Sequence, residues 1–534
     1  MKLKKMVIVL FLTVLYLPFV LGLVSKAGAW ACDVPLKGFT DSTEKPAFSA
    51  GSFLKGEFQK NFTKWYEASF KPRGVITKTY ATIRYHCFNL GNRTIGNNKD
   101  IFDQGYIDTE LCINGAADYS KEEHQKEMQD YVKKLQILQE KLQRFDKHLY
   151  VYIAPSKANF YPENIPKKYK AISDEDAITS VPYFSQLIAE TNIPHLICRD
   201  RKDALQYPAF YTTGIHWSRT FEQETSARII RELSEITGKN YRNILLGEVH
   251  QSSKPYGRDS DVYDLLNVWG EPQGTYYEYT VNGEHPEEYE KIKILVHGDS
   301  FGQGIVGDIR GLYPYEMVWY ANRAQYITDE KGKTTKLGSW EDFDFSICLD
   351  NIDVVVLEAT EPTLQNYAYG LVDCLIDFLD TYEPQKSSRN YVENLNCASK
   401  EAWEINPFNG VWTKGEKHKF VWAKDYTEIR LKSEMIKMSG LELQIGISPH
   451  LFEGDGTPDT VEVFVNGKRL LQKDFYEAWS GSLFITAEEL SGIGDEDRYD
   501  IEIYCSKSFI PKEKGINDDS RDLAIQLMYA GRAR

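Results

Sequence analysis

The sequence predicts a three-layer α/β/α domain with a mostly parallel sheet, followed by a C-terminal all-β sandwich. Two observations lead to this fold class. In the first 400 residues, short apolar strands alternate with helical segments, which is typical of a parallel sheet covered on both faces. In the last 130 residues or so, apolar and polar residues alternate one by one, as in half-buried antiparallel strands.

The α/β part is built from two helices and three strands that the pattern defines well. Residues 120–145 have an apolar stripe at helical spacing, and residues 149–153 follow as a strand. A second helix is expected over 221–236, ending at Gly238, because glycine commonly ends helices. Residues 292–296 and 353–357 are continuous apolar runs and are expected to be buried strands of the same sheet.

The C-terminal part begins after a linker expected at 390–406, so the sandwich is assigned to 400–534. Residues 441–445, 461–465 and 499–504 alternate apolar and polar side chains. Asn466-Gly467 follows the second of these strands and predicts a tight hairpin turn. Four aromatic residues of this module would suit a carbohydrate-binding surface if exposed, or would otherwise pack inside it: Trp412, Trp422, Tyr476 and Trp479.

The N-terminus predicts export. Three lysines precede an apolar run from Met6 to Val24, which is about the length that spans the hydrocarbon core of a bilayer. The basic residues should stay cytoplasmic, so the rest of the chain is expected outside the cytoplasm, either membrane-anchored or secreted. Ala27-Gly28-Ala29 is a usable cleavage site, so residues 1–30 are either a signal peptide or an anchor. Residues 31–100 are expected to form a stalk and lead-in segment on the next domain, polar and turn-rich up to residue 60.

Composition limits the classes of function. The 534 residues carry a net charge of −15, which argues against nucleic acid as a partner. The eight cysteines are scattered without C-x-x-C spacing, so no metal site is expected, and no cofactor is indicated.

Ser300 is the candidate nucleophile. It lies in G-D-S-F directly after a predicted strand, and open α/β sheets bind ligands at the carboxyl ends of their strands. His216 is the candidate base, because it precedes a predicted helix and a serine hydroxyl needs an adjacent base to attack. The alternative for His216 is a structural histidine.

Several short blocks around these residues match one family in order. They are G-E-F-Q at 56–59 with Phe62, Trp65, Phe70 and Arg73, P-S-K at 155–157 with Y-P-E at 161–163, T-G-I-H-W at 213–217, D-S-D at 259–261 with L-L-N at 265–267, G-D-S-F at 298–301, and L-E-A-T-E at 357–361. In combination, over residues 50–370, they resemble the alginate O-acetyltransferase-like SGNH hydrolases of bacterial exopolysaccharide pathways.

The resemblance implies an SGNH-hydrolase-like domain, assigned to 101–395, that transfers an acetyl group through an acyl-serine on Ser300. The implied acceptor is a polysaccharide hydroxyl, and the implied donor is a membrane-bound O-acyltransferase. Two alternatives stay open. One is an acetylesterase that uses the same serine with water as the acceptor, and the other is a catalytically weak glycan-binding assembly protein.

One departure from the family bears on the chemistry. The alginate enzymes carry an aspartate two residues before the histidine, where this chain has Gly214. Three readings follow: another acceptor orients His216, the site works as a bare Ser-His dyad, or the site is degenerate. The acceptors considered are a backbone carbonyl or one of the carboxylates Asp200, Asp203, Glu358 and Glu361.

Further pocket candidates surround the nucleophile. Gly298, Asn322, Arg323 and Trp217 are candidates for the oxyanion site or the pocket wall, and Arg310 is a further charged donor. Asp299 is expected to hold its own loop rather than to act in catalysis. Ser156 with Lys157 offers an alternative Ser-Lys pair, although the Y-P-E that follows favours a structural loop.

Overall fold

The computed structural model describes residues 2–26, 34–38, 44–173, 176–314, 316–323, 325–384, 391–397, 408–412, 420–452, 456–493 and 497–534. Its centre is a seven-stranded sheet in the order β10-β9-β8-β7-β11-β3-β4, with β8, β7, β11, β3 and β4 parallel and β9 and β10 added antiparallel. The strands are β3 (His148–Ala154), β4 (His195–Ile197), β7 (Lys293–Gly298), β8 (Met317–Asn322), β9 (Tyr326–Thr328), β10 (Thr334–Lys336) and β11 (Val354–Thr360).

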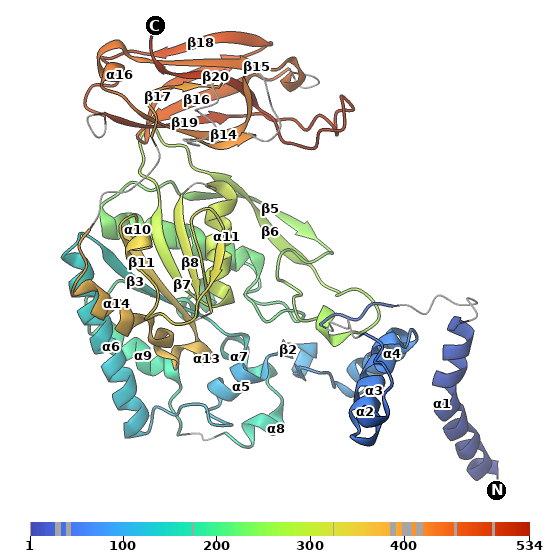
Figure 1. The fold of residues 1–534 in the computed structure, drawn as a ribbon. Coiled ribbons are helices and arrows are strands. Elements are labelled where there is room, and N and C mark those ends of the chain that lie inside the picture. Colours follow the sequence, from blue (N-terminus) through green and yellow to red (C-terminus); the bar gives the residue numbers. More distant parts are fainter. Residues whose placement is uncertain are drawn as a thin grey trace.

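Helices cover both faces of this sheet (Figure 1). One face packs on α6 (Glu122–Gln143), α9 (Ser180–Ala189) and α14 (Leu371–Leu379), and the other on α10 (Arg219–Thr237) and α11 (Ser300–Leu312). Strand β11 shows why its sequence is continuously apolar, because Val355 and Leu357 enter the first core while Val354 and Val356 enter the second.

Shorter elements connect these layers. They are η1 (Asn97–Lys99), α5 (Gln104–Glu110), α7 (Lys157–Phe160), η2 (Pro162–Asn164), α8 (Lys167–Lys170), η3 (Cys198–Ala204), η4 (Asp264–Leu266), α12 (Ser346–Leu349), α13 (Glu361–Leu364) and η5 (Tyr367–Gly370). A hairpin of β5 (Ile244–Ser252) and β6 (Tyr276–Gly283) stands beside the sheet (Figure 1), and the segment between its strands carries the D-S-D block.

In the C-terminal part, all the ladders between the described strands are antiparallel. Its elements are β12 (Leu395–Asn396), β13 (Phe408–Trp412), β14 (Val421–Lys432), α16 (Glu434–Ser439), β15 (Leu441–Ile447), η6 (Pro449–Leu451), β16 (Asp459–Val465), β17 (Lys468–Phe475), β18 (Trp479–Ile485), β19 (Arg498–Cys505) and β20 (Ile525–Arg532). Asn466 and Gly467 form the β16–β17 turn with positive φ, as the sequence predicts. Instead of two separate sheets, hydrogen bonding gives one curled, nearly closed sheet, because β14 pairs with β19 at one end and β20 at the other.

The C-terminal module sits on the amino ends of the central strands (Figure 1). Lys291, just before β7, pairs with Glu428 at 3.1 Å, and the Tyr289 hydroxyl donates to Glu502 at 2.7 Å. Arg242 also faces Glu502, at 3.7 Å, and both side chains are fully buried. These contacts place the module at the sheet edge opposite the one at which β7 delivers Ser300. Most of the expected linker at 390–406 lies outside the described residues, so the domain boundaries stay predictions.

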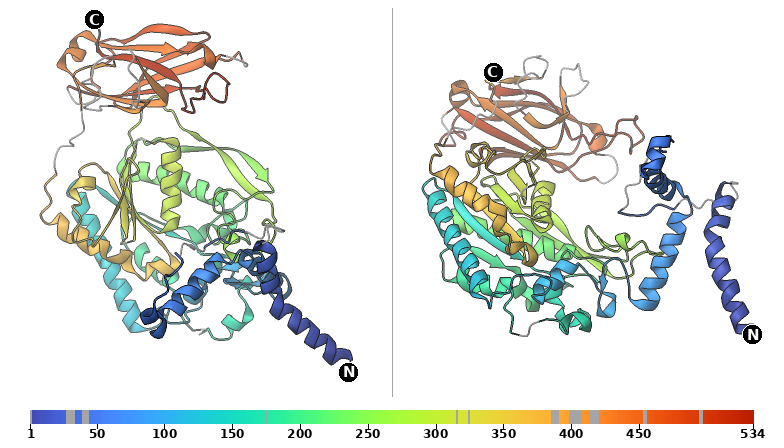
Figure 2. Two further views of the ribbon diagram at one scale, coloured as in Figure 1. Left: turned by 45° about the vertical axis from the view of Figure 1, so that its right-hand side comes forward. Right: turned by 60° about the horizontal axis from the view of Figure 1, so that its bottom comes forward.

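The N-terminal part holds α1 (Lys2–Lys26), α2 (Ala50–Leu54), α3 (Glu57–Ser69), α4 (Arg73–Phe88) and a small ladder of β1 (Thr94–Ile95) with β2 (Ile101–Phe102). In α1, residues Lys4–Val24 are long and apolar enough to cross a membrane, with a mean hydropathy of 2.8. Figure 2 shows α1 projecting from the side of the protein that carries α2–α4. The expected turn-rich lead-in was wrong in part, because α2 and the start of α3 fall within it. The suggested cleavage site lies outside the described residues.

Candidate active site

Ser300 is the first residue of α11, directly beyond the end of β7. Asp299 caps this helix, since its side chain accepts a hydrogen bond from the Phe301 N–H at 2.9 Å. Asp299 also accepts from the Thr360 hydroxyl at 2.9 Å, so it holds its own loop, as the sequence favours. A Cβ on Gly298 would come within 2.2 Å of a Glu358 carboxyl oxygen, which explains the glycine at the turn.

His216 reaches Ser300 from the loop before α10. Its Nε2 lies 2.6 Å from the Ser300 Oγ, a hydrogen-bond distance at which the imidazole can take the serine proton. Two features hold His216 and its loop in place. Ser218 caps α10 by accepting from the Phe221 N–H, and the imidazole packs on the Phe301 ring at 4.8 Å between centroids.

Asp261 supplies the carboxylate that is absent at residue 214. Its Oδ2 lies 2.6 Å from His216 Nδ1, and its Oδ1 accepts from the Ile215 N–H at 3.0 Å. The side chains of His216 and Asp261 are only 12% and 20% exposed, so little water competes for this contact. A carboxylate on Nδ1 keeps the proton on that nitrogen and leaves Nε2 free to accept from Ser300.

Two of the carboxylates considered from sequence, Glu358 and Glu361, make other contacts. Glu358 accepts from the Asp299 N–H at 2.7 Å, and burial next to the Asp299 carboxylate raises the pKa of Glu358 well above its usual range. Glu361 accepts from the Ser156 hydroxyl, and burial raises its pKa as well. Asp200 is exposed on η3, and the side chain of Asp203 lies outside the described residues. The expectation that Glu358, Glu361 or Asp200 orients His216 is corrected, because the carboxylate on His216 is that of Asp261.

The reason for the replacement is steric. A Cβ on Gly214 would lie 2.8 Å from the Asp259 carbonyl oxygen and 3.0 Å from that of Arg258. The backbone that carries Asp261 therefore passes through the space that a side chain at residue 214 would need. The D-S-D block already contained Asp261, but 45 residues separate it from His216, and only the folded hairpin brings them together.

Lys157 binds the backbone of the loop that carries His216. Its ammonium is fully buried, pairs with Asp100 at 3.0 Å and donates to the carbonyls of Tyr211 at 2.6 Å and Gly214 at 3.0 Å. Burial lowers the pKa of Lys157 to about 8, although the Asp100 carboxylate opposes that shift. Ser156 bonds to Glu361 instead, so the Ser-Lys pair considered from sequence has both members engaged elsewhere.

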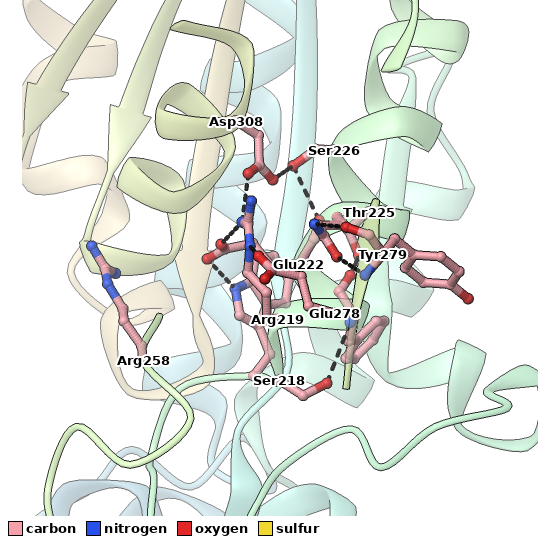
Figure 3. A network of polar contacts seen from close by, with 12 residues as sticks. Ser218, Arg219, Glu222, Thr225, Ser226, Arg258, Glu278, Tyr279 and Asp308 are labelled. Atoms are coloured by element: carbon pink, nitrogen blue, oxygen red, sulfur yellow. Dashed lines mark hydrogen bonds and ion pairs between the residues drawn. The ribbon is translucent and has the colours of Figure 1, made fainter. Parts of the chain in front are cut away.

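A polar network fixes α10 against α11 (Figure 3). The Arg219 guanidinium contacts Glu222 at 2.6 Å, Glu278 of β6 at 3.2 Å and Asp308 of α11. Asp308 also accepts from the Ser226 hydroxyl at 2.6 Å. Since α10 follows His216 and α11 begins at Ser300, this network helps to hold the side chains of His216 and Ser300 at their separation.

Of the remaining pocket candidates, some lie near Ser300 and others lie away from it. Asn322 ends β8 beside Gly298, and its amide donates to the Tyr326 hydroxyl at 2.6 Å. The Arg323 N–H donates to the Gly298 carbonyl at 3.0 Å, with Arg323 in the left-handed region at φ 48°. Trp217 is buried and donates to Glu222 at 3.1 Å, so it belongs to the core rather than to the pocket wall. Arg310 donates to the Val318 and Asp329 carbonyls, at the far end of α11.

Arg258 is a site residue that the sequence reasoning missed. Its guanidinium donates to the carbonyl oxygen of Ser300 and to the Gln303 side chain at 3.1 Å. It precedes the D-S-D block directly, so one segment places both a cation and the Asp261 carboxylate at the start of α11. Figure 3 shows Arg258 beside that helix.

Solved structures to which this chain is similar include three bacterial proteins. The O-acetyltransferase domain of Pseudomonas putida AlgJ is 14% identical, with 53% of this chain and 99% of that chain covered and a TM-score of 0.33. Pseudomonas aeruginosa AlgX is 12% identical, with 85% and 98% covered and a TM-score of 0.28. Bacillus cereus PatB1 is 12% identical, with 45% and 91% covered and a TM-score of 0.26.

These are structures of the family that the sequence blocks resemble. No family model matches the chain, and no curated protein matches its sequence. At such identities and TM-scores the likeness carries no argument about chemistry, which rests on the side-chain geometry of this chain.

Proposed function

We propose that the protein is an extracytoplasmic O-acetyltransferase that moves an acetyl group through Ser300 onto a hydroxyl of an exopolysaccharide or cell-wall glycan. One observation carries the proposal: Asp261, His216 and Ser300 form a continuous hydrogen-bonded chain with two contacts of 2.6 Å. Such a chain meets the geometric requirement for activating a serine nucleophile, whatever the order of its members in the sequence.

The first half-reaction acylates the enzyme. The Ser300 Oγ attacks the carbonyl carbon of the acetyl donor while His216 Nε2 takes the hydroxyl proton. The donor's leaving group departs with the bonding electron pair and receives that proton from His216. Negative charge on the carbonyl oxygen would be stabilised by the Ser300 N–H at the start of α11, where helix N–H groups lack intrahelical partners, with the Asn322 amide as a second donor.

The second half-reaction transfers the acetyl group. A sugar hydroxyl attacks the acyl-serine carbonyl as His216 accepts its proton, and the proton returns to the Ser300 Oγ as the ester bond to the enzyme breaks. If water attacks instead, the same residues hydrolyse the ester. Transferase and esterase therefore differ in what excludes water from the acyl-enzyme, not in the residues that react.

The acetyl donor is proposed to be a membrane-bound O-acyltransferase. The support is the apolar helix α1, which is long enough to keep the chain at the membrane where such a donor would act.

We also propose a glycan-binding role for the C-terminal module, with Tyr476 as its exposed aromatic ring. Trp412 and Trp422 pack against the module's own core, and Trp479 packs on Phe475 at 5.0 Å, which leaves Tyr476, 68% exposed, as an open ring. The module also sits about 20 Å from Ser300, the length of the six residues of β7 at about 3.3 Å each. A glycan bound there would be held away from the reacting hydroxyl, as a long polymer can be.

The test is transfer from p-nitrophenyl acetate to a neutral oligosaccharide by the full chain in detergent. We expect an early burst of p-nitrophenol and an oligosaccharide heavier by one acetyl group, both lost in Ser300→Ala. Acetate released with no acetylated sugar would favour the esterase. No burst and no difference between the wild type and Ser300→Ala would reject acyl transfer at this serine.

A further inference from the structure

An exposed ladder of aromatic rings runs along α3. We use aromatic ladder for Phe48, Phe58, Phe62, Trp65, Tyr66 and Phe70. Phe58, Phe62 and Tyr66 recur at every fourth position of α3 and so form one stripe, which Phe70 continues just beyond the end of the helix. Neighbouring rings lie 5.2 to 6.3 Å apart between centroids.

The ladder is open to the surroundings. No described residue of α2 or α3 is buried, and Phe48 and Tyr66 are 66% and 53% exposed. A contiguous apolar surface of this kind usually marks an interaction site. The rest of α3 is polar, with Lys60 and Lys64 on the side away from the stripe, so the helix is amphipathic rather than a misplaced core element.

The position of α1 indicates what covers the ladder. A Cβ built on Gly22 of α1 would lie 3.1 Å from the Phe70 ring, so the end of the ladder touches α1 there. Gly22 lies two residues before Val24, where the apolar span ends. With the N-terminal lysines inside, this end of α1 lies at the outer headgroup region, the depth at which tryptophan and tyrosine collect. Figure 2 shows the α2–α3 segment beside that end of α1.

Charge favours a lipid surface. Residues 44–90 contain eight lysines and arginines but only three acidic residues, in a chain whose net charge is −15. A local surplus of five positive charges beside a membrane helix is attracted by anionic headgroups, each basic residue near the surface contributing about 1 kcal/mol. The Lys45 ammonium lies 5.3 Å from the centre of the Trp65 ring, so one of these charges is on the ladder's own face.

We propose that the aromatic ladder lies in the headgroup region on the outer face of an anionic bilayer, as a second membrane contact besides α1. An amphipathic helix with aromatic residues on one face and lysines on the other is typical of such interfacial binding. The inference does not depend on the acetyl-transfer chemistry.

This contact would fix the active site relative to the bilayer. Helix α4, which follows the ladder, packs on the segment after Asp261: Tyr85 meets the Tyr263 ring at 6.2 Å, and the Trp269 N–H donates to Thr82 at 2.8 Å. The Arg73 N–H at the start of α4 donates to the carbonyl of Phe70, the last residue of the ladder, at 2.9 Å, so α4 links the ladder directly to the Asp261 segment. Seating the ladder on the bilayer would hold the site at one height and orientation above it.

The experiment uses the full chain reconstituted in vesicles of brominated phosphatidylglycerol and phosphatidylcholine, since bromine quenches nearby indoles. The chain has ten tryptophans, so the emission of Trp65 alone is taken as the difference between the wild type and Trp65→Phe. Trp479→Phe, in the distant C-terminal module, is the matched control. We expect most of the Trp65 emission to be quenched by the brominated lipid and protected from aqueous iodide, with no such quenching of the Trp479 emission.

Two further arms separate the outcomes. Replacing the anionic lipid by brominated phosphatidylcholine alone should reduce the quenching of Trp65, and Phe62→Ser with Tyr66→Ser should abolish it while α1 keeps the chain on the vesicle. The proposal is wrong if Trp65 of the wild type is open to iodide and unquenched by lipid in anionic vesicles that contain no other protein. A membrane protein that covers the ladder would then be the better interpretation.

Discussion

Asp261→Asn tests the assignment of the third member of the site. Asparagine keeps the size of the side chain, and its carbonyl oxygen can still accept from the Ile215 N–H. Its amide would then face His216 Nδ1 and could only donate to it. That contact requires the histidine proton to move to Nε2, the atom that lies 2.6 Å from the Ser300 Oγ, so the base could no longer accept from the serine.

The expected loss is large. Where the geometry is kept and the tautomer is wrong, turnover falls by about 10⁴-fold, which corresponds to about 5.4 kcal/mol of transition-state stabilisation. We therefore expect Asp261→Asn to lower kcat for p-nitrophenyl acetate by about this factor, with KM and the unfolding temperature close to those of the wild type.

A matched control lies three residues along the chain. Asp264 is exposed, and its nearest cation is Lys37 at 4.0 Å, so Asp264→Asn should leave kcat unchanged. A kcat for Asp261→Asn within about threefold of the wild type, in a folded protein, would refute the assignment of Asp261 and leave His216 working as a bare base.

Three further predictions follow from the surroundings of the site. Gly214→Asp should not supply His216 with a second carboxylate, because the new side chain should displace the 258–261 backbone. We expect this to cost about 1–3 kcal/mol of stability and to lower turnover, measured by thermal unfolding and kcat. A variant with unchanged stability and turnover would contradict the 2.8 Å approach of the Asp259 carbonyl to a Cβ at residue 214. Glu358→Gln should gain stability relative to the wild type as pH rises. The wild-type carboxyl group has a raised pKa in the folded protein, so it contributes less stability as it loses its proton. Urea titrations at several pH values would show a constant difference in unfolding free energy between the two proteins if this is wrong. Burial lowers the pKa of His297 from 6.5 to about 4. The wild type should therefore lose up to about 3 kcal/mol of unfolding free energy as pH falls from 6.5 to 4, whereas His297→Phe should not lose this contribution. Equal acid sensitivity of the two proteins, measured by urea unfolding, would refute this prediction.

The sequence predicts best where one segment alone decides the outcome. The apolar stripe of α6, the glycine after α10 and the Asn466-Gly467 turn are local features, and the structure contains all three. The antiparallel module was recognised from its alternation, but its closure into one curled sheet depends on how β14 divides its hydrogen bonds between two partners. Strand alternation carries no information about that division.

The candidate site shows the same limit. Ser300 and His216 could be singled out because Ser300 begins a helix after a strand and His216 lies three residues before the next helix along its own segment. Asp261 could not, because its role depends on the β5–β6 hairpin and on a close approach of its backbone to Gly214. Arg258 was missed for the same reason. Four of the six ladder residues belong to a family block, but the stripe and its exposure are visible only in the folded chain.

The central claim is that Ser300 forms an acyl-enzyme with His216 as its base. The most direct measurement is intact-mass spectrometry of the full chain, quenched with acid shortly after mixing with p-nitrophenyl acetate, followed by peptide mapping. We predict one added acetyl group on Ser300 in the wild type, and none in Ser300→Ala or His216→Ala over the same interval. An acetyl group on another residue, or equal acetylation of the wild type and His216→Ala, would contradict the account.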